Sequence, residues 1–183
     1  MFRVYFDMDG VLADFAKGVE NLQLGYSIEK LNNSGKFLNE ENKKLKINMY
    51  EKIDKTGVSF WEKLPLMEKT KELYDYCLHY NPYILTAAPS TFGVDHSLFK
   101  NAEIGKKIWV KKHIGQKQLD RFICTESSLK SSFVDKEKSK QILIDDRIKN
   151  IESWEDAGGI GILFKTAEQA LIDLKELEKK WEK

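Results

Sequence analysis

Short apolar runs alternate along the chain with longer stretches in which apolar residues recur every three to four positions. The short runs are rich in β-branched and aromatic residues. They predict strands at residues 2–6, 83–86, 121–124, 141–144 and 160–164. The longer stretches predict helices at residues 11–24, 66–80, 102–113, 148–157 and 166–181. Because strands that alternate with helices form parallel sheets covered on both faces, we expect a three-layer α/β fold with a five-stranded parallel sheet.

The segment between residues 26 and 58 departs from this alternation. It holds a loop-forming run at residues 32–35, followed by a lysine-rich stretch of helical pattern in which apolar residues are sparse. The apolar positions of that stretch are Leu38, Leu45, Met49 and Ile53. Gly57 and the aromatic pair Phe60 and Trp61 close the segment. This pattern favours a small, mostly helical insertion rather than a second full domain.

Polar residues stand directly after the apolar runs. They are Asp7, Asp9, Thr86, Thr125, Asp145 and Asp146. The carboxyl ends of parallel strands meet at one edge of the sheet, where ligands bind in such folds, so we expect these side chains to converge. Gly10 would turn the chain after the first two. Paired carboxylates at such a turn suit a divalent cation and a phosphate ester.

The residue types at this edge favour metal-assisted phosphoryl chemistry. Carboxylates from Asp7 and Asp145, with water and phosphate oxygens, are the ligands that Mg²⁺ prefers. With the phosphate charge neutralised, an anionic carboxylate could attack the phosphorus and form an aspartyl-phosphate. Asp9 could protonate the leaving oxygen and later deprotonate the attacking water. Thr86 stands where a phosphate-binding hydroxyl is needed, and one lysine should complete the charge balance.

Four blocks of the sequence, taken in order, resemble the haloacid dehalogenase-like (HAD) hydrolase superfamily. They are DMDGVLADF, LTAAPS, a lysine and ILIDDRIKNIESWEDAGG. Within the superfamily the chain is most similar to the 5'(3')-deoxyribonucleotidase family, including its phage and bacterial members. The resemblance implies a Rossmann-like, HAD-like catalytic core at residues 1–14 and 64–183. It also implies a small helical cap at residues 15–63, inserted after the first strand, that covers the site and selects the substrate.

The resemblance further implies an activity and roles for single residues. The activity is that of a Mg²⁺-dependent phosphomonoesterase that acts on (deoxy)nucleoside monophosphates through an aspartyl-phosphate. Asp7 matches the nucleophile and a metal ligand, and Asp9 the general acid/base, with its backbone carbonyl on the metal. The remaining matches are Asp145 as a metal ligand, Asp146 as a carboxylate that orients metal-bound water, and Thr86 and Ala87 as phosphate-binding positions.

The lysine of the motif set is assigned to Lys130, as a catalytic and phosphate-binding group. The apolar pair Phe133 and Val134 that follows it matches the run that the family has there. Three other lysines crowd the same loop and could take this role instead: Lys136, Lys138 and Lys140.

Aromatic and basic residues near the motifs match substrate-binding positions of the family. Phe15, Phe60 and Trp61 stand where relatives place aromatic side chains that stack on the base, and Arg147 follows the aspartate pair as it does in them. Aromatic faces hold bases well. The alternative is that Phe60 and Trp61 only pin the cap to the core.

Charge and composition argue against other functions. Thirty Lys and Arg against 29 Asp and Glu give a net charge of +1, which does not favour a generally basic nucleic-acid binder. The basic run at residues 106–117 is better explained as a helix whose lysines face water. Cys77 and Cys124 lack metal-ligand spacing and favour buried free thiols.

No stretch approaches the ~20 apolar residues of a membrane span, so we expect a cytoplasmic protein with no membrane contact. The expected partner is a small phosphate ester, with nucleic acid disfavoured and a homo-oligomer left open. Two functions besides that of a nucleotidase stay open as well. One is a phosphatase for another small ester such as a sugar phosphate, and the second is a non-catalytic interaction module that keeps the fold.

Overall fold

A computed structural model of the chain describes residues 2–26, 28, 40–135 and 140–181. Its centre is a five-stranded sheet in the order β3-β2-β1-β4-β5, in which all neighbouring strands are parallel. The strands are β1 (Arg3–Phe6), β2 (Tyr83–Ala87), β3 (Phe122–Thr125), β4 (Gln141–Asp145) and β5 (Ile160–Leu163). The predicted α/β fold with a five-stranded parallel sheet is confirmed.

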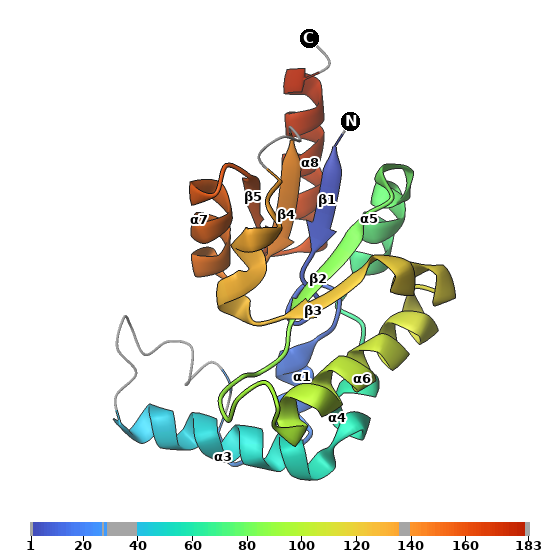
Figure 1. Ribbon diagram of the computed structural model, residues 1–183. Helices are drawn as coiled ribbons and strands as arrows, with labels where there is room; N and C mark the ends of the chain where they lie inside the picture. Colours follow the sequence, from blue (N-terminus) through green and yellow to red (C-terminus); the bar gives the residue numbers. More distant parts are fainter. Residues whose placement is uncertain (1, 27, 29–39, 136–139, 182–183) are drawn as a thin grey trace.

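Helices cover both faces of this sheet (Figure 1). The α-helices of the described residues are α1 (Phe15–Glu20), α3 (Glu40–Thr56), α4 (Val58–Glu62), α5 (Thr70–Tyr76), α6 (Ser97–His113), α7 (Ile148–Asp156) and α8 (Ala167–Trp181). Of these, α1, α3 and α4 lie beyond the carboxyl ends of the strands (Figure 1). Shorter 3-10 helices are η1 (Cys77–Tyr80), η2 (Gln116–Arg121) and η3 (Ser127–Phe133). Successive side chains of a strand point to opposite faces. Tyr5 therefore packs with Trp154 of α7, whereas Phe6 packs in the larger core with Tyr74 of α5 and Leu174 of α8.

The helix expected at residues 11–24 is much shorter. The carbonyl of Met8 accepts hydrogen bonds from the backbone N–H groups of Leu12 and Ala13, at 2.8 Å each, so the chain forms a tight buried turn after β1. Helix α1 starts only at Phe15, where the carboxylate of Asp14 accepts from the backbone N–H of Lys17 at 2.8 Å. The apolar residues at 11–13 are thus core residues of a turn, which a helical spacing cannot distinguish from a helix face.

The helix expected at residues 66–80 also starts later, because its first residues pair with the turn after β1. Leu66 forms a bridge with Ala13, and the N–H of Met67 donates to the carbonyl of Leu12 at 2.9 Å. Lys69 then adopts φ 58° before α5 begins. In contrast, α6 starts several residues before its expected position.

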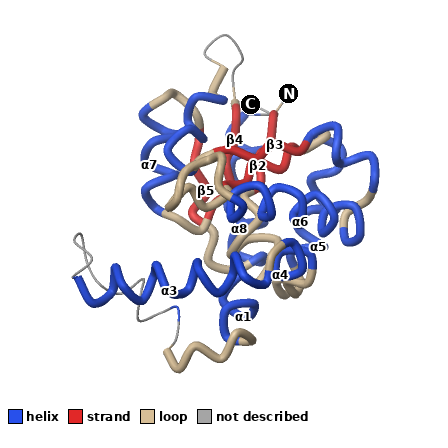
Figure 2. The backbone as a smooth tube through the Cα atoms, turned by 60° about the horizontal axis from the view of Figure 1, so that its bottom comes forward, coloured by secondary structure: helices blue, strands red, loops and turns tan. Residues whose placement is uncertain are grey.

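The insertion is helical where the structure describes it, while the run at 32–35 and Leu38 lie outside the described residues. Figure 2 shows α3 and α4 beside α6. The α4–α6 contact is close because α6 has a glycine there. A Cβ at Gly105 would lie 2.5 Å from the Cβ of Trp61 and 2.6 Å from the carbonyl oxygen of Val58. The boundaries of the cap at residues 15 and 63 stay a prediction.

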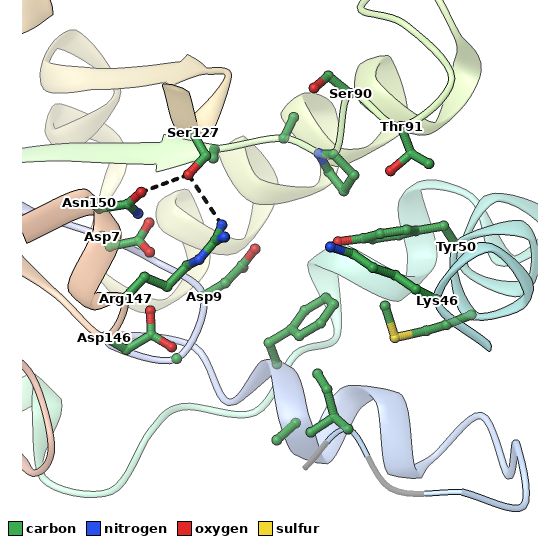
Figure 3. A pocket seen from close by; sticks show the side chains of 18 of the residues that line it. Asp7, Asp9, Lys46, Tyr50, Ser90, Thr91, Ser127, Asp146, Arg147 and Asn150 are labelled. Atoms are coloured by element: carbon green, nitrogen blue, oxygen red, sulfur yellow. Dashed lines mark hydrogen bonds between the residues drawn. The ribbon is translucent and has the colours of Figure 1, made fainter. Parts of the chain in front are cut away.

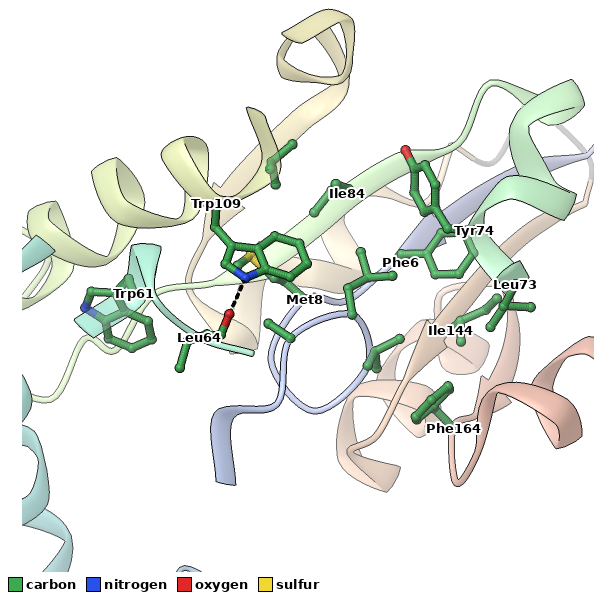
Figure 4. Packing of buried hydrophobic residues seen from close by; sticks show 14 of the residues in the cluster. Phe6, Met8, Trp61, Leu64, Leu73, Tyr74, Ile84, Trp109, Ile144 and Phe164 are labelled. Carbon is green, nitrogen blue, oxygen red and sulfur yellow. Dashed lines mark hydrogen bonds between the residues drawn. The ribbon is translucent and has the colours of Figure 1, made fainter. Parts of the chain in front are cut away.

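A second link runs from α6 to the segment that follows α4. The indole N–H of Trp109 donates to the carbonyl of Leu64 at 2.7 Å within the core (Figure 4). Both groups are shielded from water, since Trp109 and Leu64 are almost fully buried. Helix α6 therefore fixes the end of the insertion against the sheet.

We expect Gly105→Ala to destabilise the protein by about 1–3 kcal/mol, because the added methyl group would force α4 away from α6. The same change at an unobstructed helix position would stabilise by up to about 1 kcal/mol. Chemical denaturation of the wild type, the variant and Lys111→Ala, an exposed α6 control, measures the effect. A Gly105→Ala variant as stable as the wild type would contradict the close contact.

Two further predictions concern the cysteines and membranes. Both cysteines are free thiols, with Cys77 buried and Cys124 partly buried. In the part of the chain that the structure describes, no helix has the length and apolar character needed to cross a membrane.

Candidate active site

Acidic side chains converge at the carboxyl ends of the central strands. Phe6 pairs with Ile144, so the residues that follow them, Asp7 and Asp145, lie side by side. Asp146 comes next on the same loop. One oxygen atom from each of these three carboxylates lies within 4.8 Å of the other two. The predicted meeting of strand-end carboxylates therefore occurs, and Figure 3 shows Asp7 and Asp146 of this group.

Lys130 of η3 lies between two of these carboxylates and is 1% exposed. Its Nζ is 2.8 Å from Asp7 Oδ1 and 2.7 Å from Asp145 Oδ2. Burial disfavours the charged amine, but the two carboxylates outweigh it and raise the pKa of Lys130. Lys140 lies before β4, beside the rings of Phe2 and Trp181, and so at the opposite end of the strand. Lys136 and Lys138 lie outside the described residues.

The carboxylates are held in fixed orientations. Asp7 Oδ1 accepts the backbone N–H of Met8 at 2.7 Å as well as the ion pair with Lys130, and Oδ2 accepts no hydrogen bond from the described residues. Asp145 accepts the Arg147 N–H at 2.9 Å and both oxygens accept from Asn150 Nδ2, at 3.0 and 2.9 Å. The sequence prediction missed Asn150. The sequence signal for this role is weak, because an asparagine in the first turn of a helix can serve many structural purposes.

A second buried lysine was also missed. The basic run at residues 106–117 was expected to face water, but Lys106 is 0% exposed, whereas Ile104 and Ile108 are 50% and 41% exposed. Lys106 Nζ donates to Asp9 Oδ2 at 2.7 Å, to Thr86 Oγ1 at 2.9 Å and to the carbonyl of Ala87 at 2.5 Å. That part of the prediction is wrong, because α6 turns this lysine toward the carboxyl ends of the strands.

Asp9 is the carboxylate on the cavity side of this lysine. Its Oδ2 accepts from Lys106, while its buried Oδ1 has no hydrogen-bond partner among the described residues. Burial raises the pKa of Asp9, and the charge of Lys106 opposes the shift. A carboxyl group whose pKa is raised and that has one oxygen without a hydrogen-bond partner is suited to proton transfer. Gly10 is needed beside it, since its φ is 80° and a Cβ there would collide with the carboxylate of Asp146.

The three converging carboxylates fit a hard divalent cation. Asp146 opens toward the cavity, yet the dense protein around it and the charges of Asp7 and Asp145 raise the pKa of its carboxyl group to about 8. A divalent ion would offset the repulsion between these carboxylates. Carboxylate oxygens are ligands that suit Mg²⁺. Asp7, Asp145 and Asp146 could hold such an ion. The contact expected from the backbone carbonyl of Asp9 stays a prediction.

A cavity of about 460 Å³ opens beside the carboxylates. Core residues and cap residues both line it, including Asp7, Asp9, Ala87, Lys130, Asp146 and Arg147 from the predicted set and Lys46, Tyr50 and Ser127 in addition. The guanidinium of Arg147 donates to Ser127 Oγ at 3.2 Å (Figure 3). The volume is typical of sites for small molecules.

The three predicted aromatic residues form one cluster, but only part of it faces the cavity. Phe15 lies parallel to Trp61 with ring centroids 5.8 Å apart, and Phe60 meets Trp61 edge-on at 5.0 Å. Phe15 and Trp61 line the cavity, whereas Phe60 is not in its wall and is 6% exposed. A Cβ on Gly18 would approach Phe60. Phe60 thus packs against α1 and Trp61, within the insertion, and does not line the cavity.

Solved structures that match the chain share its architecture. A hydrolase from Streptococcus pneumoniae TIGR4 matches with a TM-score of 0.50 and 16% identity, covering 97% of each chain. A hydrolase from Pseudomonas syringae matches with a TM-score of 0.50 and 14% identity, covering 98% of this chain and 99% of that one. The chain has their fold. The three-layer, Rossmann-like core with a five-stranded parallel sheet is confirmed at the level of fold.

A HAD hydrolase of family IA, variant 3, from Entamoeba histolytica HM-1:IMSS also matches, with a TM-score of 0.47 and 16% identity over 88% of this chain and 84% of that one. No protein-family model and no curated protein sequence matches the chain. The likeness to the two hydrolases with a TM-score of 0.50 shows the fold alone and leaves the activity to be argued from the site.

Proposed function

We propose that the protein is a Mg²⁺-dependent phosphomonoesterase that acts through an aspartyl-phosphate. The observation that carries this proposal is the joint arrangement of Asp7, Lys130 and Asp9. One oxygen of Asp7 is held by Lys130 and the Met8 N–H, and the other accepts no hydrogen bond from the described chain. A carboxylate fixed in this way at a cavity wall is suited to nucleophilic attack.

The proposed reaction has two displacements. In the first, Asp7 attacks the phosphorus, the bond from phosphorus to the leaving oxygen breaks, and Asp9 gives its proton to that oxygen. In the second, Asp9 takes a proton from water, which attacks the aspartyl-phosphate and releases phosphate and the free carboxylate of Asp7. Mg²⁺, held by Asp7, Asp145 and Asp146, would offset the charge of the phosphate oxygens. Lys130 stabilises negative charge beside Asp7 throughout.

We also propose that the substrate is a (deoxy)nucleoside monophosphate. The cavity of about 460 Å³ is large enough for such a ligand, and Phe15 gives one wall a partly exposed aromatic ring. The fully buried ring of Trp61 stacks against the ring of Phe15. Phe60 is not included among the proposed substrate-binding residues. Ala87, which lines the cavity, is proposed to meet the phosphate. Thr86, which is fully buried and outside the cavity wall, is joined to Ala87 through Lys106.

A substrate panel tests both proposals. Phosphate release is measured from deoxynucleoside and ribonucleoside monophosphates and from sugar phosphates, in Mg²⁺, in EDTA and after Mg²⁺ is restored. We expect turnover of nucleoside monophosphates that is lost in EDTA and returns with Mg²⁺. Turnover of sugar phosphates alone would reject the proposal of a nucleotide substrate. Undiminished turnover in EDTA would reject the proposed dependence on Mg²⁺. No release from any ester would reject the activity.

A further inference from the structure

The cap wall of the cavity carries its own polar groups, separate from the carboxylate cluster. Lys46 and Tyr50 lie one helical turn apart on α3 and point across the cavity toward Arg147 and Asp9 (Figure 3). Both side chains are half-buried. The Tyr50 hydroxyl has no hydrogen-bond partner in the described ranges, and Arg147 faces it from the core side. The described side chains thus offer two cations and one hydroxyl donor to the same space.

The two cations differ from the lysines deeper in the site. Lys130 is paired with Asp7 and Asp145, and Lys106 with Asp9. Within residues 40–135 and 140–181, in contrast, neither Lys46 nor Arg147 forms an ion pair with a carboxylate. Burial lowers the pKa of Lys46, and the positive charges of Arg147 and Lys149 lower it further.

Holding cations together without a counter-charge is unfavourable, and an anion between them would reverse that cost. The reacting phosphate does not need this pair, because its expected position beside Asp7 already has Lys130 and the proposed metal. The anion that Lys46 and Arg147 suit is therefore a different group of the same ligand. Because Lys46 belongs to the cap wall, across the cavity from the core residues, this group has to be on the leaving group.

Building on the proposed function, we infer that the leaving group of the substrate carries a second anionic group. Lys46 and Arg147 bind that group, and the Tyr50 hydroxyl donates a hydrogen bond to it. A phosphate or a carboxylate would satisfy this chemistry. Among nucleotides, a nucleoside 3',5'-bisphosphate would then be a better substrate than the monophosphates of the proposed function.

Matched substrate pairs test the inference. They are a deoxynucleoside 3',5'-bisphosphate against its two monophosphates, fructose 1,6-bisphosphate against fructose 6-phosphate, and 3-phosphoglycerate against glycerol 3-phosphate. We expect the doubly anionic member of at least one pair to have a kcat/KM roughly 10- to 100-fold higher, as charge-assisted hydrogen bonds give. The pairs also separate a second phosphate from a carboxylate and a nucleotide from a sugar.

The variant Lys46→Met should bring the ratio within the preferred pair close to one. Lys44→Met, an exposed lysine on the same helix, should leave the ratio unchanged. Equal kcat/KM values within every pair would overturn the inference. So would a Lys46→Met variant that loses the same factor on both members, since Lys46 would then serve the reacting phosphate.

Binding measured by calorimetry separates this inference from the proposed activity. A bisphosphate that binds at least about 10-fold more tightly than the monophosphates, and loses that advantage in Lys46→Met, supports the anion site even without turnover. Such a result with no phosphate release would reject the phosphatase alone. Equal binding of both members, with normal turnover of monophosphates, would reject the second anion site alone.

Discussion

Asp7→Asn is expected to abolish phosphate release, lowering kcat by roughly 10³-fold or more, while the protein stays folded. The amide cannot form an aspartyl-phosphate, so the route through a covalent intermediate is closed. The fold should tolerate the change, because Asp7 lies within a group of carboxylates that repel one another. Steady-state phosphate release and thermal unfolding of the same preparation measure the two effects.

A matched control and a trapping experiment sharpen this test. Asp156→Asn, at an exposed position near the end of α7, should keep wild-type turnover. Substrate labelled in its phosphate should transfer label to the wild-type chain in a bond that hydroxylamine cleaves, and not to Asp7→Asn. An Asp7→Asn variant with normal turnover would show that Asp7 is not the nucleophile.

Lys106→Met is expected to cost about 3–5 kcal/mol of the free energy of unfolding. The change leaves the Asp9 carboxylate without its cation and removes the donor to Thr86 and Ala87, and an unpaired buried charge is costly. For a chain of this length the melting temperature should fall by roughly 10 °C. Turnover should fall as well, since Lys106 fixes the orientation of Asp9.

The double variant separates the charge pair from simple packing. Adding Asp9→Asn to Lys106→Met removes the unpaired charge, so part of the lost stability should return. Lys107→Met is the control, because the neighbouring lysine is exposed and its one ion pair among the described residues is with Glu103. It should change the free energy of unfolding by about 0.5 kcal/mol or less. A Lys106→Met protein as stable as Lys107→Met would contradict the buried pair.

The strands and the acidic edge could be read from the sequence because their pattern is local. A short apolar run that stops on a carboxylate indicates a buried strand with its polar end at the sheet edge, and Asp7 and Asp145 follow this rule. Lys130 was assigned to the site by resemblance to the family, and nearby lysines were alternatives for the same role. Only the tertiary structure separates it from Lys140, which lies at the other end of β4.

The missed lysine shows where helical patterns mislead. Lys106 lies four residues after Ala102 and four before Val110, both buried, so it falls within the apolar stripe of α6. Its position in that stripe was the available signal, but the neighbouring lysines suggested a solvated face. The turn at residues 11–13 was misjudged for another reason. Its residues are buried by a reversal of the chain, and a spacing rule carries no information on such reversals.

The close contact at Gly105 has a consequence for how this protein could change its specificity. Gly105 and Lys106 are neighbours on α6, so the helical turn that touches α4 also holds the Asp9 carboxylate. Substitutions in α4 would disturb recognition and proton transfer together. Lys46 and Tyr50 belong to α3 and face the reaction centre across the cavity. Mutations in α3 are therefore expected to change the substrate specificity while the catalytic groups keep their positions.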